Sequence, residues 1–205
     1  CFTVQTFSGG NLIFVIANAT NDAGNNYIQT NLSSVLTTST WYHIACTYDG
    51  SQAGNTDKAK IYVNGTEATY GSGGGTIPNT TSASTGSFNI GRWDLGGSDN
   101  RLLNGKIDEV AIFNSAIPIG NVWDGSGEPI DVSTVSGIVS YYKMGENATF
   151  VYGANPDGTW SVPDEVGTND GTSNNLMADS ARVGDAPSST NNAVSLNMDF
   201  VDVVP

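Results

Sequence analysis

Four short segments rich in β-branched and aromatic residues follow one another in the middle of the chain. Each is bounded by Gly, Asn or Asp, and none shows the apolar spacing of a helix. They are residues 41–50 (WYHIACTYDG), 59–65 (AKIYVNG), 87–93 (SFNIGRW) and 104–114 (NGKIDEVAIFN). The sequence therefore predicts short strands separated by turns, which is typical of an all-β domain.

Composition also favours sheet over helix. The 205 residues include 25 Gly and only 13% charged residues, whereas long helices are rich in Ala, Leu, Glu and Lys. The length suits one β-rich domain with an appendage and is sufficient to bury a core. We therefore expect a mostly neutral, hydrogen-bonding surface.

The formal net charge of −13 restricts the partners. Residues 1–130 contain 5 basic and 10 acidic side chains and residues 131–205 contain 2 and 10, so the two parts carry −5 and −8. Both would repel phosphate backbones and anionic lipids. Neither nucleic acid nor membrane insertion is expected, and no apolar run reaches the length of a membrane span.

The first residues predict a hairpin. Within residues 1–18, the turn Ser8-Gly9-Gly10 separates CFTVQTF from NLIFVIAN. Residues 11–17 are apolar on both alternating faces, which is typical of a strand inside layered structure. A short strand is predicted to follow at 27–31.

Turn chemistry predicts a second hairpin at residues 59–70. Asn64-Gly65 suits a type I′ turn, in which both central residues have positive φ. Residues 71–86 have no apolar period and are predicted to be a long loop. The apolar alternation slips at Asp108-Glu109, which predicts a β-bulge or a strand covered on both faces.

The C-terminal part differs in kind. Residues 114–131 are expected to hold one helical or 3₁₀ turn, and residues 119–137 are predicted to be a linker. Residues 138–205 are predicted to be a loop-rich extension with two strands, at 138–145 and 193–204. About 45 polar, turn-rich residues separate these strands. We expect the extension to lie against the main β-domain or a neighbouring chain rather than to form its own core.

Cys1 and Cys46 allow one disulfide or none, so they leave the redox compartment open. Nothing at the start has the pattern of a signal peptide. Because the chain opens inside an alternating strand pattern, we expect it to be part of a longer polypeptide.

The order of the segments resembles the laminin G-like, or concanavalin A-like lectin/glucanase, superfamily. The resemblance covers roughly residues 1–118 and is carried by WYHIACTYDG, IYVNG, FNIG and GKIDEVAIFNSAI in sequence. It implies a two-sheet antiparallel jelly-roll sandwich whose first strands would precede Cys1. Residues 141–175 (YYKMGEN to GTSNN) are similar to a segment that follows such domains in structural proteins of marine bacteriophages, and to the opening strand of the same module type.

The resemblance raises the question of hydrolysis. Glucanases of the superfamily carry E-x-D-x-x-E on one strand, because two carboxylates must flank the scissile bond at about 5 to 5.5 Å for retention. No such triplet occurs here, and the adjacent Asp108 and Glu109 would point to opposite faces of a regular strand, although a bulge would bring them closer. We therefore expect a protein that is not an enzyme, with hydrolysis as an alternative.

His43 is the only histidine, so neither a zinc site nor a Ser-His-Asp triad is predicted. We interpret it as a strand histidine that is hydrogen-bonded beside Trp41.

Calcium is the one cofactor that the resemblance suggests. Many members of the superfamily hold Ca²⁺ at the rim of the sandwich, where loops supply the about six to eight oxygens that this cation takes. The candidate ligands are Asp94, Asp99 and Asn100, with Asp49 or Asp57 less favoured. Asp and Asn are equally ordinary turn residues, so both interpretations stay open.

A sugar site needs an exposed aromatic ring beside amide and carboxylate groups, because the ring stacks on the pyranose while the polar groups bond its hydroxyls. Trp93 with Asp94, Asp99, Asn100 and Arg101 fits this description. Trp93 as a packing residue fits equally well.

The resemblance thus implies a non-enzymatic structural or adhesive module on an extracellular or virion surface, such as a phage fibre or decoration protein. The expected partners are other copies, other virion or surface proteins, and cell-surface glycans. A secreted bacterial carbohydrate-binding module and a glucanase-like hydrolase are the alternatives.

Overall fold

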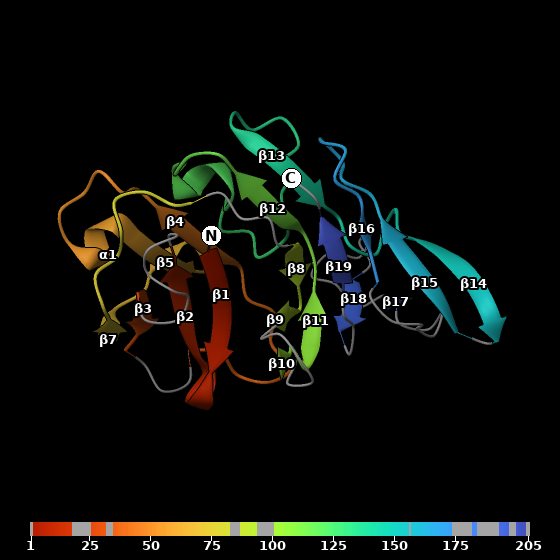
Figure 1. The fold of residues 1–205 in the computed structure, drawn as a ribbon, viewed down its shortest axis with the longest axis horizontal. Helices are drawn as coiled ribbons and strands as arrows, with labels where there is room; N and C mark the ends of the chain where they lie inside the picture. Colours follow the sequence, from red (N-terminus) through yellow and green to blue (C-terminus); the bar gives the residue numbers. More distant parts are fainter. Residues whose placement is uncertain are drawn as a thin grey trace. The chain divides into compact units, whose positions relative to one another are not determined.

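The computed structural model describes residues 2–17, 26–31, 35–82, 87–93, 101–155, 157–173, 182–183, 193–196 and 200–203. Nearly all regular structure in these ranges is antiparallel β-strand (Figure 1). The prediction of an all-β fold is confirmed, and the sheets are consistent with a jelly-roll sandwich. Within the described ranges, no helix has the length and apolar character that a membrane span requires.

The chain divides into two compact units. The first comprises Cys1–Ser84 and Ser115–Ile130, and the second comprises Thr85–Asn114 and Asp131–Pro205. The boundaries of these units differ from the division at residues 118 and 137 that is expected from the sequence. That division concerns the extent of the family module and stays a prediction. Strands from both sides of residue 118 belong to the second unit.

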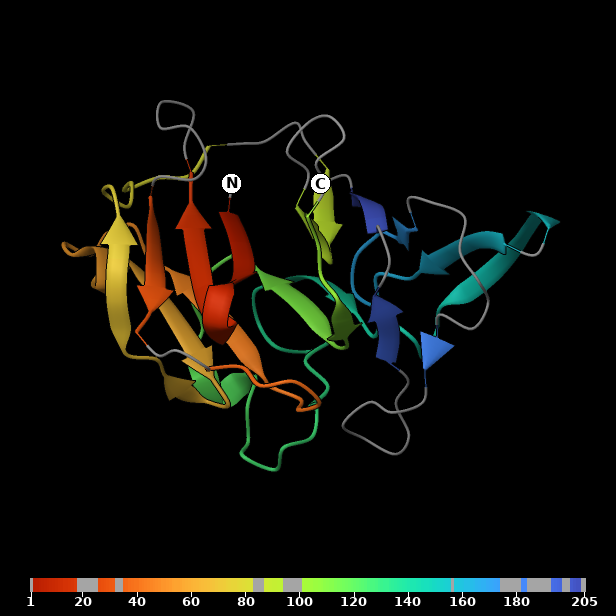
Figure 2. The same ribbon diagram turned by 90° about the horizontal axis from the view of Figure 1, so that it is seen from below.

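One sheet of the first unit has the order β1-β2-β3-β7, and Figure 2 shows its four strands, red to yellow, side by side. The hairpin at residues 2–16 is confirmed, because Phe2 pairs with Ile16 and Phe7 with Asn11. Gly9 and Gly10, with φ of 78° and 76°, make its turn. The elements are β1 (Phe2–Phe7), η1 (Ser8–Gly10), β2 (Asn11–Ile16), β3 (Tyr27–Thr30) and β7 (Tyr70–Gly74).

The other sheet of this unit has the order β4-β5-β6. Its strands are β4 (Ile44–Tyr48), β5 (Ala59–Val63) and β6 (Thr66–Glu67). Asn64 and Gly65 have φ of 48° and 75°, and Val63 pairs with Thr66, so the predicted tight hairpin is confirmed.

The two sheets share one core. The cluster joins buried side chains of the first sheet, such as Leu12, Phe14 and Ile28, to Ala59 and Ile61 of β5. Burial of each large side chain contributes about 1.5 to 3 kcal/mol. Because β2 is buried on both faces, its predicted place inside layered structure is confirmed.

The predicted loop 71–86 and the polar stretch before β5 both contain regular structure. Residues 70–74 form the edge strand β7, which pairs with β3 although it has no apolar alternation. Glycine permits this approach, because a Cβ on Gly73 would lie 2.9 Å from the carbonyl oxygen of Tyr27. The polar stretch before β5 contains the single helical turn α1 (Asn55–Lys58), whose Lys58 Nζ donates to the Ile77 carbonyl at 2.9 Å.

Segment 115–130 contributes the 3₁₀ turn η2 (Ile119–Asn121), as predicted. Cys46 in β4 is a free thiol, and burial raises its pKa to about 12. Cys1 lies outside the described residues.

The second unit is built from several small antiparallel sheets. β12 pairs with β13, β11 with β18 and β8 with β19, while β14, β15 and β16 form a three-stranded sheet. The bounds are β8 (Phe88–Ile90), β9 (Arg92–Trp93), β10 (Arg101–Leu102), β11 (Gly105–Ile107), β12 (Val110–Phe113), β13 (Ile138–Tyr142), β14 (Thr149–Asn155), β15 (Asp157–Val162), β16 (Gly171–Thr172), β17 (Arg182–Val183), β18 (Ala193–Leu196) and β19 (Phe200–Val203).

The C-terminal extension contributes to a shared core. Tyr142, Met144, Trp160 and Val162 of the extension cluster with Ile90 of β8. Within this unit the extension pairs with earlier strands through β13, β18 and β19. Its expected packing on the main β-domain or a neighbouring chain stays a prediction. The hairpin β14–β15, within the polar stretch, was not predicted.

Candidate functional site

The predicted glycan and calcium residues lie mostly outside the described residues. This holds for Asp94, Asp99 and Asn100, and the side chains of Trp93 and Arg101 are not described either. The main chain of the last two is described: β9 and β10 are antiparallel, and Trp93 pairs with Arg101. The two ends of the predicted site are thus held opposite each other, while its ligand set stays a prediction.

Asp49, one of the less favoured calcium ligands, is a turn residue. Its carboxylate accepts hydrogen bonds from Gln52 Nε2 at 2.8 Å, Ser51 Oγ at 2.7 Å and the Ser51 main-chain N–H at 3.0 Å. These bonds, the one from Gln52 first, lower its pKa. Asp57 lies in α1. In the described ranges, no three His, Cys, Asp or Glu side chains are gathered so that they could hold a metal ion.

His43 differs from its predicted role. It precedes β4, and its ring packs on Trp123 of segment 115–130, with centroids 5.0 Å apart. Its Nδ1 is buried and has no hydrogen-bond partner among the described residues, and burial lowers the pKa of the ring. The main chain of His43 is hydrogen-bonded, since its N–H donates to Asn64 Oδ1 at 2.9 Å, but Nδ1 of the ring is not, and the ring packs on Trp123 rather than on Trp41. Trp123 comes from a distant segment, which the strand pattern does not indicate.

The most unusual polar group of the second unit is the acid pair Asp108-Glu109. It separates β11 from β12, which pair with different strands. The sequence predicted a β-bulge or a strand covered on both faces here; instead the strand is interrupted, and the register shift of β12 against β13 lies at Ile112/Phe113. Glu109 has a φ of 53°, which is rare for a residue with a side chain. The simple rule that adjacent strand residues point to opposite faces does not apply at this break.

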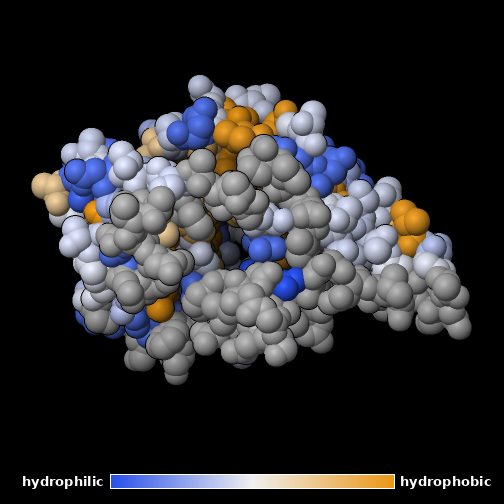
Figure 3. All heavy atoms as spheres, viewed as in Figure 1, coloured by the Kyte–Doolittle hydropathy of each residue, from blue (hydrophilic) through white to orange (hydrophobic). Residues whose placement is uncertain are grey.

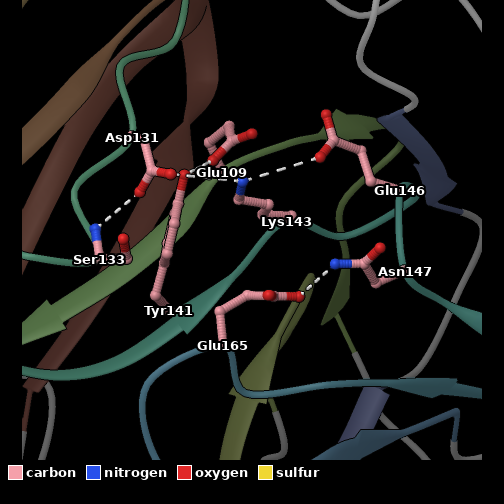
Figure 4. Close-up of polar contacts among 8 residues, drawn as sticks. All are labelled: Glu109, Asp131, Ser133, Tyr141, Lys143, Glu146, Asn147 and Glu165. Carbon is pink, nitrogen blue, oxygen red and sulfur yellow. Dashed lines mark hydrogen bonds and ion pairs between the residues drawn. The ribbon is translucent and has the colours of Figure 1, made fainter.

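Glu109 is held by β13. Tyr141 Oη donates a hydrogen bond to Glu109 Oε2 (Figure 4). Burial raises the pKa of Glu109, and the bond from Tyr141 partly offsets this effect. The pKa of Tyr141 is raised, first by burial and then by this bond to a carboxylate.

The carboxylate oxygens of Asp108 are shielded from solvent. Both of its carboxylate oxygens are buried without a hydrogen-bond partner among the described residues. Burial, followed by the nearby Glu109 and Glu146 carboxylates, raises its pKa to about 7. A large part of the Asp108 population is therefore protonated at neutral pH.

Lys143 is a positive charge that acts on Glu109, whose pKa it lowers. Its Nζ lies 3.6 Å from Asp131 Oδ2 and 3.9 Å from Glu146 Oε2, and 5.8 Å from the centre of the Tyr141 ring. Figure 4 shows it between these carboxylates, with Asn147 bonded to Glu165 nearby. We call the set Asp108, Glu109, Asp131, Tyr141, Lys143 and Glu146 the acidic cluster.

The acidic cluster offers one chemical possibility and one obstacle. An acid with a pKa near 7 beside a second carboxyl group is the charge arrangement of general acid and base catalysis. Such an acid must reach the substrate, however, and the Asp108 oxygens are buried. The arrangement favours a structural role for the pair.

Asp164 is a second buried carboxylate, which was not among the predicted site residues. Its Oδ1 accepts the main-chain N–H groups of Tyr141 at 2.9 Å, Gly167 at 3.0 Å and Val166 at 3.3 Å. Burial alone would raise its pKa, but these bonds lower it overall. The sequence signal that could have indicated this turn is the spacing Asp164-x-x-Gly167. Glycine is required at the last position, because a Cβ on Gly167 would lie 2.3 Å from Asp164 Oδ2.

Comparison with known families identifies one match. The family model described as the concanavalin A-like lectin/glucanases superfamily matches residues 2–119, more than half of the chain. This range includes the acid pair and the paired Trp93 and Arg101. Neither the curated proteins nor the solved structures yield a match.

Proposed function

Because the chain belongs to the concanavalin A-like lectin/glucanase superfamily, we propose that it is a carbohydrate-binding and adhesive module that binds its ligands without cleaving them. In this proposal the loops recognise surface glycans, and the sheets contact other protein chains. The polar, weakly charged composition supports it, because hydroxyl and amide groups suit neutral sugars better than ionic partners.

The state of the acid pair carries the proposal. Glu109 is engaged by Tyr141, and the Asp108 oxygens are buried. A retaining hydrolase needs two carboxyl groups that flank an accessible scissile bond. Burial of Asp108 favours binding over hydrolysis. The raised pKa of Asp108 favours the hydrolase alternative. The chain length of a glycan after incubation with the protein distinguishes binding from hydrolysis.

We place the glycan site at Trp93, Asp94, Asp99, Asn100 and Arg101, with Ca²⁺ held by Asp94, Asp99 and Asn100. The pairing of Trp93 with Arg101 supports this placement, because it holds both ends of the segment together. The ring of Trp93 would stack on the sugar while the amide and carboxylate groups bond its hydroxyls.

Trp93→Ala is expected to lower the affinity for the best ligand of a glycan array by about tenfold, because a lost aromatic stack costs up to about 1.5 kcal/mol. A chelator is expected to weaken wild-type binding similarly. Tyr152→Ala is the matched control, since Tyr152 is an aromatic residue that is 70% exposed outside the proposed site. Unchanged affinity in Trp93→Ala would remove this site from the account, and binding that is insensitive to chelator would remove the calcium.

We further propose that the module works on an extracellular or virion surface, in the manner of a phage fibre or decoration protein. The similarity of residues 141–175 to segments of phage structural proteins motivates this setting. Gold-labelled antibodies against the protein should decorate particles in lysates of the source culture. Labelling confined to the cell interior would contradict the proposal.

A further inference from the structure

Residues 115–130 form a segment that we call the strap. They belong to the first unit, whereas the residues before and after them in the chain belong to the second. Within the described ranges, the hydrogen bonds of the strap join its own residues, such as Ser126 N–H to Asp124 at 2.8 Å. Contact with the strands of the first unit is made by an aromatic side chain, that of Trp123.

Trp123 packs on two features of the β4-β5-β6 sheet. Its indole lies on the ring of His43, with the centroids 5.0 Å apart and the planes inclined by 32°. It also covers Gly65 in the turn between β5 and β6, where an added Cβ would collide with Cδ1 and Nε1 of the indole. Glycine at position 65 is therefore part of the seat of the indole.

His43 is the fixed partner in this contact. Its main-chain N–H donates to Asn64 Oδ1, and its carbonyl accepts the Asn64 N–H, both at 2.9 Å. Asn64 lies in the tight turn that joins β5 to β6. Since the sheet holds the imidazole in place, any opening of the contact has to come from movement of the strap.

Nδ1 of His43 makes the contact sensitive to protonation. This nitrogen is buried without a hydrogen-bond partner among the described residues. A neutral ring with its proton on Nε2 places only a lone pair there, whereas an imidazolium would place a charged N–H there without an acceptor. Burial accordingly lowers the pKa of the ring.

Neighbouring charges do not account for this effect. The titratable groups on the elements around the ring belong to Tyr42, Lys60, Tyr62, Glu67, Asp124 and Glu128. Lys60 and Glu67 neutralise each other in an ion pair at 3.0 Å. None of the six is a cause of the lowered pKa of His43, which is due to burial.

We propose that the contact between His43 and Trp123 is an acid-sensitive latch, in which protonation of His43 releases the indole and with it the strap. The inference does not depend on the glycan function proposed above. The neutral ring packs on the indole, whereas the protonated ring needs water or an acceptor at Nδ1, and the open latch admits water.

Linkage gives the direction of the response. Burial lowers the pKa of docked His43 below its ordinary 6.5, and an undocked ring would keep an ordinary value. Docking is therefore strongest above about pH 6.5 and weakens as pH falls from there through the lowered pKa. Cation–π attraction of an imidazolium to the indole acts in the opposite direction. Desolvation outweighs it here because the buried Nδ1 has no acceptor.

Release would change the character of the surface. Figure 3 shows that the described residues on the face in view are mostly hydrophilic, blue to white, with hydrophobic residues in separate patches. In the strap, residues 124–128 (DGSGE) are exposed and contain no large apolar side chain. A freed Trp123 would therefore add an aromatic contact group to a polar segment at acidic pH.

Proton NMR of the imidazole tests the latch directly, because His43 is the only histidine of the chain. The pKa of His43 is expected to lie below 6.5 in the wild type and to rise toward 6.5 in Trp123→Ala, which uncovers the ring. A wild-type pKa at or above 6.5 overturns the proposal, because attraction to the indole would then outweigh desolvation. A pKa that Trp123→Ala leaves unchanged overturns it as well.

Fluorine NMR of protein labelled with fluorotryptophan reports the position of the indole. Trp123→Phe assigns its signal among the four tryptophans. Between about pH 7.5 and about pH 5 the Trp123 signal is expected to move toward its undocked position, with about a tenfold change in the docking equilibrium for each unit by which the measured pKa lies below the ordinary value. A signal that does not move contradicts the proposal.

Three variants identify the group that responds. His43→Phe keeps an aromatic contact that cannot be protonated, so the Trp123 signal should stay at the docked position; a signal that still follows pH would assign the switch to another group. Gly65→Ala should give the undocked position at every pH. Gly9→Ala is its matched control, since φ is 78° at Gly9 and 75° at Gly65 but a Cβ on Gly9 meets open space. Equal signals in the two glycine variants would show that the indole does not rest on this turn.

Discussion

Asp164→Ala is expected to lower the free energy of unfolding by about 3 kcal/mol. The carboxylate accepts four main-chain N–H groups, three at Oδ1 and that of Asn169 at Oδ2, and the residue Tyr141 is deeply buried. Each buried donor left without an acceptor costs about 1 to 3 kcal/mol. The segment from Asp164 to Asp170 also contacts β13 through the bond from Tyr142 Oη to the Asn169 carbonyl, so its loosening would reach the core.

Urea unfolding of the purified variants at pH 7 measures this effect. Asp164→Asn is the graded control, because its side-chain oxygen can keep the three bonds made to Oδ1, and it is expected to lose about 1 kcal/mol. If alanine and asparagine destabilised the protein equally, the main-chain bonds would not be the cause. A loss below about 0.5 kcal/mol for alanine would contradict the role of Asp164 altogether.

Asp108→Asn is expected to stabilise the protein above pH 7 and to change the pH dependence of its stability. The pKa of Asp108 is about 7 in the folded chain and 3.8 in a free carboxyl group, so the folded state binds its proton more tightly. The stability linked to this group is fully present below about pH 4 and is lost as pH rises through about 7. Because Asp108 is only partly buried, solvent screening reduces the effect of this shift, and a gain of about 1 to 2 kcal/mol is expected.

The free energy of unfolding of the wild type and of Asp108→Asn should be compared from pH 4 to pH 9. The difference between them should grow up to about pH 7 and then stay constant. Asp124→Asn is the control, because Asp124 is an exposed turn residue whose pKa is lowered by its bonds to Ser126. A variant that is less stable than the wild type at pH 8 would show that ionised Asp108 has a stabilising partner.

Local signals predicted much of the first unit. The type I′ turn at Asn64-Gly65 and the doubly apolar β2 depend on neighbours in sequence, so one sequence suffices to recognise them. β7 could not be recognised, because its glycines carry no pattern and its pairing comes from the main chain of β3. The hairpin β14–β15 was missed because Gly153 and Gly158 interrupt the apolar alternation of its arms.

The candidate site was predictable only in part. The slip at Asp108-Glu109 marked the break between two strands, but nothing in sequence indicated that Tyr141, 32 residues away, would bond Glu109. The contact of Trp123 with His43 is equally non-local. Long-range pairs of this kind depend on which strands become neighbours, and turn and periodicity signals do not specify that.

The central claim is that the protein binds glycan and leaves it intact. The most direct measurement incubates the protein with the best array ligand in polymeric form and determines the chain length of the recovered glycan by mass spectrometry. The account predicts retention of the glycan at unchanged length. Shortened chains that disappear when the Asp108→Asn variant is used would contradict it and would make the buried acid pair catalytic.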